Sequence, residues 1–465
     1  MEVTKEFDSF KKPSISSINI YGLFGHLNHK IDLNESGITF IHGPNGCGKT
    51  TVLRLLSSLF TWDTQILLET DFSKIEITKT DHSVFCIDRV IKDGDEYERK
   101  IPALTFYIEG SLLEPFTLSV DLSPARIAAR IPPSEVTEFL PFLIRIAPRE
   151  WRDRNTGEII EYPDIIRRYG EKLPFFSSKR RPEWLMSYIS SISLHLIKTQ
   201  RLLNVDSSNL RRSRGDEHSV TDVIQLYANE IKETISEKLA EQAAVSQLHD
   251  RSFPERLLTF TPDKAISEFQ IRTMYSETEE KIQGLVDAGL IDPQTNISLP
   301  TKALAETERT VLSLYLQDVN KKLSVFDDLQ NKIQVFLEIV AKKLKSKRFS
   351  VNRKDGFLIE SLHGAGGTLH PTQLSSGEQH QIVLFYELIF KANKNSFFLI
   401  DEPEISLHID WQRSFLHDIQ KISVLGDSIF LIATHSPQII GGHRELAIAL
   451  EAGILEGEDN AANTI

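Results

Sequence analysis

The sequence predicts an α/β fold of two lobes, each with a mixed sheet and flanking helices, separated by a helical insertion without a long coiled coil. Three observations predict this fold. A short apolar run near the start of the chain is followed by a glycine-rich loop and a helical pattern. Two further apolar runs near the other end are each followed by polar residues. The segment between them carries apolar residues at helical spacing, interrupted by prolines.

The glycine-rich loop, Gly43 to Thr50, fits the phosphate-binding pattern of glycine, four residues and Gly-Lys-Ser/Thr. It lies between a buried-strand pattern, Ile38 to His42, and a helical pattern, Thr51 to Phe60. The glycines let backbone N–H groups turn toward phosphates at a helix N-terminus, where the helix dipole also favours an anion. Lys49 adds a positive charge, and the Thr50 hydroxyl is suited to Mg²⁺. The nucleotide-binding residues predicted in this segment are Gly43, Asn45, Gly46, Gly48, Lys49, Thr50 and Thr51.

A second apolar run, Phe397 to Ile400, is followed by Asp401 and Glu402. A carboxylate directly after a buried strand suits a metal site, so we expect Asp401 to bind Mg²⁺ through water. We expect Glu402 to polarise the attacking water as a general base. The alternative is an acidic turn after a core strand, with no chemical role.

His435 follows a third run, Ile429 to Thr434, and therefore stands at another strand end. A single histidine is more often only structural. Here, three strand ends each carry a polar group that phosphoryl transfer needs, and open parallel α/β sheets bind ligands at the carboxyl ends of their strands. We therefore predict that His435 shares a catalytic site with Lys49 and Glu402.

These motifs, together with Leu374 to Gln379, resemble those of the ABC-type ATPases. The resemblance is to the soluble branch that includes SMC, Rad50, RecF and the bacterial "AAA family ATPase" group with an ABC signature. It implies ATP hydrolysis with ATP and Mg²⁺ bound, and it implies that His435 is the switch histidine. It also implies that Ser375 and Gly377 contact the γ-phosphate bound by the other subunit, with Glu378 beside them in the signature.

The signature residues also begin a helical pattern that runs through Ile389, so their free N–H groups form a second anion site. One chain therefore carries two kinds of phosphate site. A single nucleotide is held best when each kind faces the other on a twofold-related chain, which predicts a homodimer or a higher homo-oligomer. Taken alone, Ser-Ser-Gly-Glu is also an ordinary N-cap.

A glutamine near the γ-phosphate and the metal is a further expectation of this resemblance. The candidate Mg²⁺ ligand is Gln200, which follows an apolar segment that contains Ile192, Leu194 and Ile197. A surface polar residue after a strand is the alternative interpretation.

Composition limits the class of protein. The chain has 465 residues, a hydrophobic content of 40% and a formal net charge of −12. Its two cysteines, Cys47 and Cys86, predict no disulfide framework and a reducing, cytoplasmic setting. No apolar stretch is long enough to cross a bilayer, so no membrane partner is expected. Net acidity argues against a protein that coats nucleic acid, although three basic runs are candidates for DNA contact: Lys179–Arg181, Arg211–Arg214 and Lys342–Arg348.

The predicted domains follow from the spacing of the motifs. Residues 1–205 form an N-terminal lobe, with antiparallel strands near Val84 to Val90 and Leu104 to Ile108 and a helical or irregular piece near 120–190. Residues 206–345 form an arm of moderately long helices, and residues 346–465 form the C-terminal lobe. The residues expected to break the helices of the arm are Pro254, Pro262, Pro293 and Pro300.

A finer resemblance is to the ATPase subunits of bacterial anti-phage defence systems, closest to the Septu type. It rests on segments such as Trp151 to Asp153, Lys198 to Leu202 and Asp250 to Leu257. It implies a separate nuclease partner of the HNH type that the ATPase regulates, and we expect no nuclease domain in the chain itself. The alternative is a DNA-repair or recombination ATPase of the RecF/Rad50 type that binds DNA directly. A transporter cassette fits the signature poorly.

Overall fold

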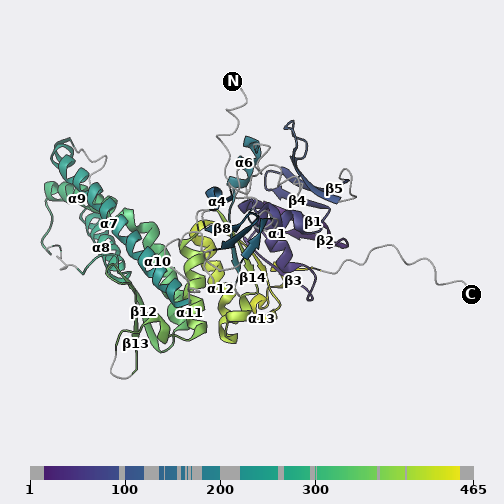
Figure 1. The fold of residues 1–465 in the computed structure, drawn as a ribbon. Coiled ribbons are helices and arrows are strands. Elements are labelled where there is room, and N and C mark those ends of the chain that lie inside the picture. The colour runs from purple at the N-terminus through teal and green to yellow at the C-terminus, as the bar shows by residue number, and fades with distance from the viewer. Residues whose placement is uncertain are drawn as a thin grey trace, which may run out of the picture.

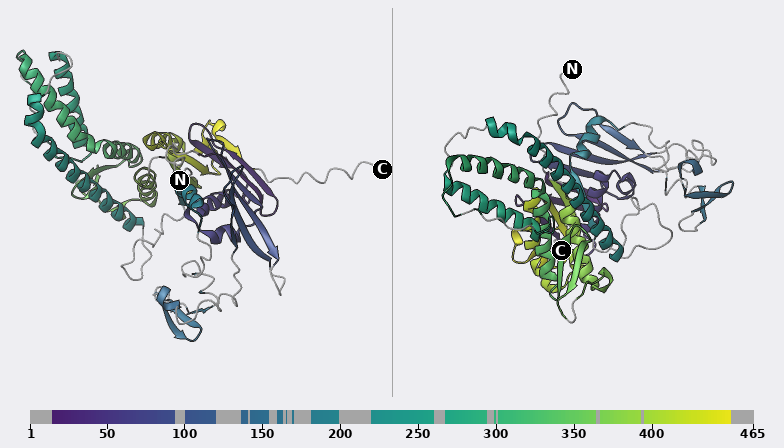
Figure 2. Two further views of the ribbon diagram at one scale, coloured as in Figure 1. Left: turned by 90° about the horizontal axis from the view of Figure 1, so that it is seen from above. Right: turned by 90° about the vertical axis from the view of Figure 1, so that its left-hand side faces the viewer.

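The computed structural model describes residues 15–93, 100–119, 136–140, 142–153, 159–162, 165, 169, 181–198, 220–259, 267–293, 299, 301–363, 367–392 and 395–450. A head built from the two ends of the sequence carries an arm of helices that extends to one side (Figure 1). Figure 2 shows the same arm from two further directions, with α7 running along most of its length. None of the helices in the described part of the chain is long and apolar enough to cross a membrane.

The centre of the head is a parallel sheet of five strands that both ends of the sequence supply. In spatial order, the strands are β11 (Ser193–Lys198), β14 (Ser396–Asp401), β15 (Ile429–Ala433), β3 (Ile38–His42) and β16 (Ala447–Ala449). The three apolar runs recognised in the sequence are β3, β14 and β15. Because all pairings in this sheet are parallel, the polar residues that follow these strands emerge at one edge.

Side chains alternate between the two faces of this sheet, and each face has its own hydrophobic core. Phe397, Leu399 and Leu431 lie in one core with the buried face of α1 (Lys49–Thr61). Phe398 and Phe430 are stacked in the other core, where α11 (Ser376–Phe390) and α12 (Ile409–Gly426) cover the sheet. The glycine loop and the signature therefore begin helices that pack on opposite faces of one sheet.

An antiparallel sheet of six strands covers the outer side of α1. Its spatial order is β2 (Leu27–Asp32), β1 (Ile15–Leu23), β4 (Lys74–Lys79), β5 (Val84–Asp93), β6 (Lys100–Ile108) and β7 (Phe116–Ser119). The expected strands near Val84 and Leu104 are part of β5 and β6, which pair in antiparallel fashion. α2 (Thr64–Glu69) and α6 (Glu183–Ser190) complete this side of the head.

The expectation of helical or irregular chain near 120–190 was incomplete, because the described part of this region contains strands as well as helices. A sheet of three short strands, β8 (Leu143–Ala147), β9 (Glu150–Asp153) and β10 (Ile159–Glu161), lies there beside α4 (Val136–Phe139). Trp151 is completely buried and is part of a small separate core. Strands of three to five residues are too short for their alternation to stand out in the sequence.

The arm consists of α7 (Val220–Thr259), α8 (Glu268–Asp287), α9 (Glu306–Leu323), η3 (Ser324–Phe326) and α10 (Asp327–Lys343). The prediction that Pro254 breaks a helix was wrong, because α7 is a helix of 40 residues that contains it. Arg256, two residues later, binds Asp318 of α9 through two hydrogen bonds of 2.6 Å. This buried carboxylate holds the last turns of α7 in place and offsets the loss of one backbone hydrogen bond.

A two-stranded ribbon, β12 (Lys347–Asn352) and β13 (Gly356–Ser361), connects the arm to the signature segment. The remaining short elements lie around the sheet edge and its connections. They are η4 (Pro371–Gln373), η5 (Pro403–Ser406), α13 (Pro437–Ile440) and η6 (Arg444–Leu446).

Candidate nucleotide-binding site

The glycine loop joins β3 to α1, and two of its glycines adopt backbone angles that other residues avoid. Gly46 and Gly48 have φ angles of 86° and 90°. At Gly43, an added Cβ would lie 2.5 Å from the carbonyl oxygen of Leu450, which follows β16. The loop therefore needs glycine at these positions for its path and for the close approach of a second segment.

Lys49 is 5% exposed and lies over the loop. Its Nζ donates hydrogen bonds to the carbonyl oxygens of Gly43 and Pro44, at 2.9 and 3.1 Å. The Cys47 sulfur lies 3.7 Å from the same nitrogen. Carbonyl oxygens carry only partial negative charge, so a phosphate is a stronger partner for this ammonium group. The loop thus fits an anionic phosphate chain.

His29 on β2 contacts the backbone of the glycine loop, a role that was not predicted from the sequence. It is 3% exposed, and its Nε2 lies 2.8 Å from the carbonyl oxygen of Cys47. Burial lowers the pKa of His29, although the hydrogen bond to Cys47 opposes this. The imidazole is therefore neutral near pH 7, and its N–H fixes the backbone at the turn of the loop.

Thr50 and Asp401 lie together although they come from opposite ends of the sequence. The Thr50 hydroxyl donates a hydrogen bond of 3.1 Å to Oδ1 of Asp401. A hydroxyl and a carboxylate are the hard oxygen ligands that Mg²⁺ prefers. In the described part of the chain, no group of three or more His, Cys, Asp or Glu residues could hold a metal ion. The pair suits a metal that takes its other ligands from phosphate and water.

Glu402 begins the turn after β14 in the left-handed backbone region, with φ at 48°. Its N–H donates to the carbonyl oxygen of Ala433, at 2.8 Å, which couples the ends of β14 and β15. Its Oε1 lies 3.6 Å from Nε2 of His435. A non-glycine residue in this region is strained and persists only where its surroundings fix it. The carboxylate and the imidazole predicted to act together are thus neighbours.

Glu404 fixes the segment that carries His435, and this role was also missed. Its Oε2 accepts a hydrogen bond of 2.8 Å from the Thr434 hydroxyl, and its Oε1 accepts one of 2.5 Å from the His435 N–H. The sequence offered a signal, since Glu404 belongs to the acidic tetrad after β14. The contact of Glu404 with the end of β15 could not be predicted, because no local sequence pattern marks a residue that binds the end of a neighbouring strand.

The signature segment forms the N-terminus of α11. Ser375 is the N-cap, and its backbone N–H and its hydroxyl both donate to Oε2 of Glu378, at 2.8 Å each. The other carboxylate oxygen of Glu378 lies 2.7 Å from Nζ of Lys347. At Gly377, an added Cβ would lie 3.2 Å from the ring of Trp411, so a larger residue is disfavoured.

Asn45 in the glycine loop is exposed, and Thr51 in the first turn of α1 is half-buried. Gln200 lies outside the described residues, as do all of Arg211–Arg214 and part of Lys179–Arg181.

The basic run Lys342–Arg348 is largely engaged within the chain. Lys342, Lys343 and Lys347 form ion pairs with Glu338, Asp418 and Glu378.

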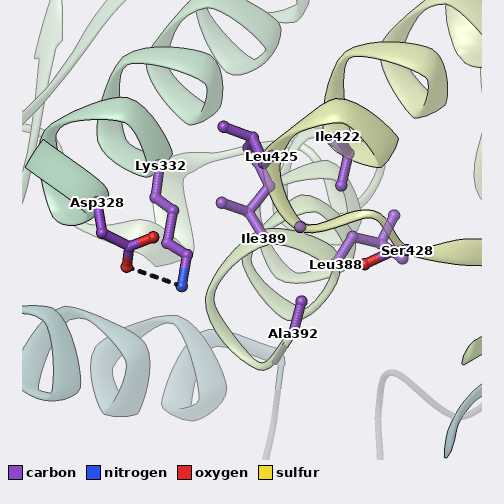
Figure 3. Close-up of a pocket in the computed structure, with 9 residues that line it drawn as sticks. Asp328, Lys332, Leu388, Ile389, Ala392, Ile422, Leu425 and Ser428 are labelled. Carbon is purple, nitrogen blue, oxygen red and sulfur yellow. Dashed lines mark ion pairs between the residues drawn. The ribbon is translucent and has the colours of Figure 1, made fainter. Parts of the chain in front are cut away.

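A small cavity of about 30 Å³ lies between α10, α11 and α12, lined mainly by Leu388, Ile389, Ile422 and Leu425 (Figure 3). An ion pair between Asp328 and Lys332 stands beside it. Ser428, which also lines it, directly precedes β15. The cavity is therefore at the amino end of this strand, whereas Thr434 and His435 follow its carboxyl end.

The glycine loop at the start of α1 and the polar groups at neighbouring strand ends define a P-loop nucleotide-binding protein. The chain belongs to the family described as "AAA ATPase domain", whose model matches residues 14–440.

Among curated proteins, the chain is similar to UvrABC system protein A of Oceanobacillus iheyensis, with 32% identity over 93 residues. These residues are 20% of the chain and 10% of that protein. Against the same protein of Borreliella burgdorferi, identity is 38% over 61 residues, which are 13% of the chain and 6% of the relative. The chain thus spans only about a tenth, or less, of the curated relatives it matches.

Among solved structures, the chain is similar to the Smc head domain with an extended coiled coil from Pyrococcus furiosus, bound to the C-terminal domain of ScpA. The TM-score is 0.35 at 13% identity, with 94% of the chain and 93% of the Smc chain covered. For the SMC head domain from Thermotoga maritima, the TM-score is 0.30 at 8% identity, with 93% and 92% covered.

Proposed function

We propose that this protein is the ATP-hydrolysing subunit of a bacterial antiviral defence system, and that it dimerises on ATP and regulates a separate nuclease. ATP hydrolysis is supported by one observation above all. At one edge of the sheet, beside the glycine loop, four polar residues lie close together: Thr50, Asp401, Glu402 and His435. The chemistry of these groups is that of phosphoryl transfer.

Each residue has a distinct proposed role at this site. The loop N–H groups and Lys49 hold the phosphates of ATP, and Thr50 with Asp401 holds Mg²⁺. Bound Mg²⁺ neutralises charge on the phosphates. Glu402 orients a water and accepts its proton, while His435, 3.6 Å from Glu402, donates to the γ-phosphate. Gln200 remains a proposed metal contact.

The trans arrangement is supported by the placement of the signature. α1 and α11 pack on opposite faces of the central sheet, in separate hydrophobic cores. The N-terminus of α11, with Ser375 and Gly377, is thus a second anion site that serves another copy of the chain. A homodimer that binds two ATP molecules uses both kinds of site.

The defence role is supported by the resemblance to the Septu-type ATPase subunit PtuA. Two of the segments that carry it lie outside the nucleotide site: Trp151 anchors the small sheet, and Arg256 ties α7 to Asp318. The partner proposed from the resemblance is a nuclease of the HNH type. Segments outside the catalytic centre are where a partner-specific surface is expected.

A second candidate function is a DNA-repair or recombination ATPase that binds DNA directly. It rests on the resemblance of the motifs to the soluble ABC-type ATPases that include RecF and Rad50. Direct DNA binding by the purified chain alone, weakened by salt, distinguishes this function from control of a nuclease.

The test combines the Glu402→Gln variant with the proteins encoded by the neighbouring genes, among which the proposal expects a nuclease. The variant keeps the phosphate and metal contacts but lacks the base, so we expect a loss of hydrolysis of about 100-fold or more. With ATP it is expected to accumulate as a dimer that co-purifies with the nuclease. Unchanged hydrolysis contradicts the role of Glu402, and an ATPase that never binds or alters the nuclease contradicts the defence role.

A further inference from the structure

Glu378 places a carboxylate directly beside the signature serine. The side chain is only 12% exposed, and Oε2 accepts hydrogen bonds from both the N–H and the hydroxyl of Ser375. Burial favours a neutral carboxyl, but hydrogen bonds from Lys347 and Ser375 outweigh it and lower the pKa of Glu378. A negative charge therefore lies next to the hydroxyl that would meet a phosphate.

Such a charge opposes nucleotide binding in trans. The γ-phosphate is itself anionic, and two like charges a few ångströms apart in a water-poor interface repel each other strongly. A glutamine would cap α11 equally well, since the capping box accepts either residue. The carboxylate at this position is compatible with the proposed interface only if a cation neutralises it.

Lys347 supplies this cation. Its Nζ lies 2.7 Å from Oε1 of Glu378, and its side chain is 17% exposed. It begins β12, four residues after the end of α10, and its N–H is bonded to the carbonyl oxygen of Leu344. Lys347 therefore lies where the arm joins the head. It is not part of any sequence motif that predicted the nucleotide site.

We propose that Lys347 is a positioning residue of the trans nucleotide site: it neutralises Glu378 and orients this carboxylate so that Ser375 faces the phosphate of the partner. This inference rests on the proposed function, because it concerns the interface that ATP creates. Lys347 acts through Glu378 and not by touching the nucleotide.

The experiment measures the ATP-dependent dimer dissociation constant by sedimentation, with Glu402→Gln in every protein to prevent hydrolysis. Lys347→Met is expected to weaken the dimer about tenfold, because it leaves Glu378 uncompensated. Lys347→Arg is expected to restore the affinity to within about threefold. The double variant Lys347→Met/Glu378→Gln is expected to dimerise like the reference, since the capped helix no longer carries the charge.

A second readout uses proteins with Glu402 intact. If only dimer affinity is affected, the hydrolysis rate of Lys347→Met is low in dilute protein and recovers as the protein concentration rises. A purely structural defect leaves the rate low at all concentrations. Thermal unfolding without ATP confirms that each variant is folded.

The outcomes separate the inference from the proposed function. If the reference protein does not dimerise with ATP, the proposed trans interface is wrong, and the role of Lys347 falls with it. If the reference dimerises and Lys347→Met dimerises equally well, only the Lys347 inference is overturned. It is also overturned if Glu378→Gln fails to rescue Lys347→Met.

Discussion

Thr50 and Asp401 share a hydrogen bond of 3.1 Å although 351 positions separate them in the sequence. The central sheet explains this proximity. β3 and β14 both run parallel to β15, which lies between them, so the residues after their carboxyl ends emerge at one edge. All helices of the arm lie between Thr50 and Asp401 in the sequence. The segments before and after the arm nevertheless join in one sheet.

The first prediction concerns this pair. Thr50→Val keeps the shape of the side chain but removes the hydroxyl, so it is expected to weaken ATP binding about tenfold when Mg²⁺ is present. With a chelator in place of Mg²⁺, the variant and the natural protein are expected to bind ATP equally.

The matched control for this prediction is Thr61→Val, at the far end of α1, where the hydroxyl only bonds to the carbonyl oxygen of Ser57. Isothermal titration calorimetry measures both affinities. Equal binding by Thr50→Val and the natural protein in Mg²⁺ contradicts the metal role.

The second prediction concerns pH. His29 has a folded-state pKa below its ordinary value of 6.5, so the unfolded chain binds more protons as the pH falls below that value. The stabilisation from neutral His29 is therefore complete above about pH 6.5 and decreases toward lower pH, by up to about 1.4 kcal/mol per pH unit.

His29→Gln is expected to reduce this slope, because the amide can still donate to Cys47 and takes up no proton. Free energies of unfolding in urea, measured from about pH 5 to pH 7, check the prediction. Some slope is expected to remain, since burial also lowers the pKa of His195 and His380. An unchanged slope in His29→Gln contradicts a neutral, buried imidazole.

The third prediction concerns the joint between the arm and the head. Lys343 of α10 and Asp418 of α12 form an ion pair of 2.7 Å in which both side chains are 3% exposed. Lys343→Met leaves a buried carboxylate without its partner and is expected to lower the free energy of unfolding by about 3 kcal/mol. The double variant Lys343→Met/Asp418→Leu is expected to recover most of this loss.

The control is the exposed pair Lys30 and Asp32, where Lys30→Met is expected to change stability by less than about 0.5 kcal/mol. Urea denaturation measures all four proteins. If Lys343→Met is as stable as Lys30→Met, the buried pair does not hold the arm to the head.

The sequence predicted the parts of the fold and site that local chemistry defines. The glycine loop, its flanking strand and helix, and the strands before Asp401 and His435 were confirmed, because each joins a strong apolar pattern to a recognisable polar one. The capped helix that begins at the signature was also confirmed.

Features that depend on long-range contacts were not predictable from local patterns. His29 and Lys347 act on the glycine loop and the signature from other strands, so nothing beside them in the sequence marks their roles. Pro254 signals a break, but α7 continues past it, and Arg256 in its last turns binds Asp318, 62 positions away. The short strand around Trp151 is stabilised by its small core rather than by its own periodicity.

The measurement that tests the central claim most directly mixes two inactive variants. Ser375→Arg damages the signature and Lys49→Ala damages the glycine loop, so neither homodimer contains a complete site. In a mixed dimer, the intact loop of the first chain faces the intact signature of the second. We predict that mixing restores ATP hydrolysis, to at most one working site per mixed dimer. If the mixture is as inactive as its separate components, while mixed dimers form, the two halves of the site do not act across the interface.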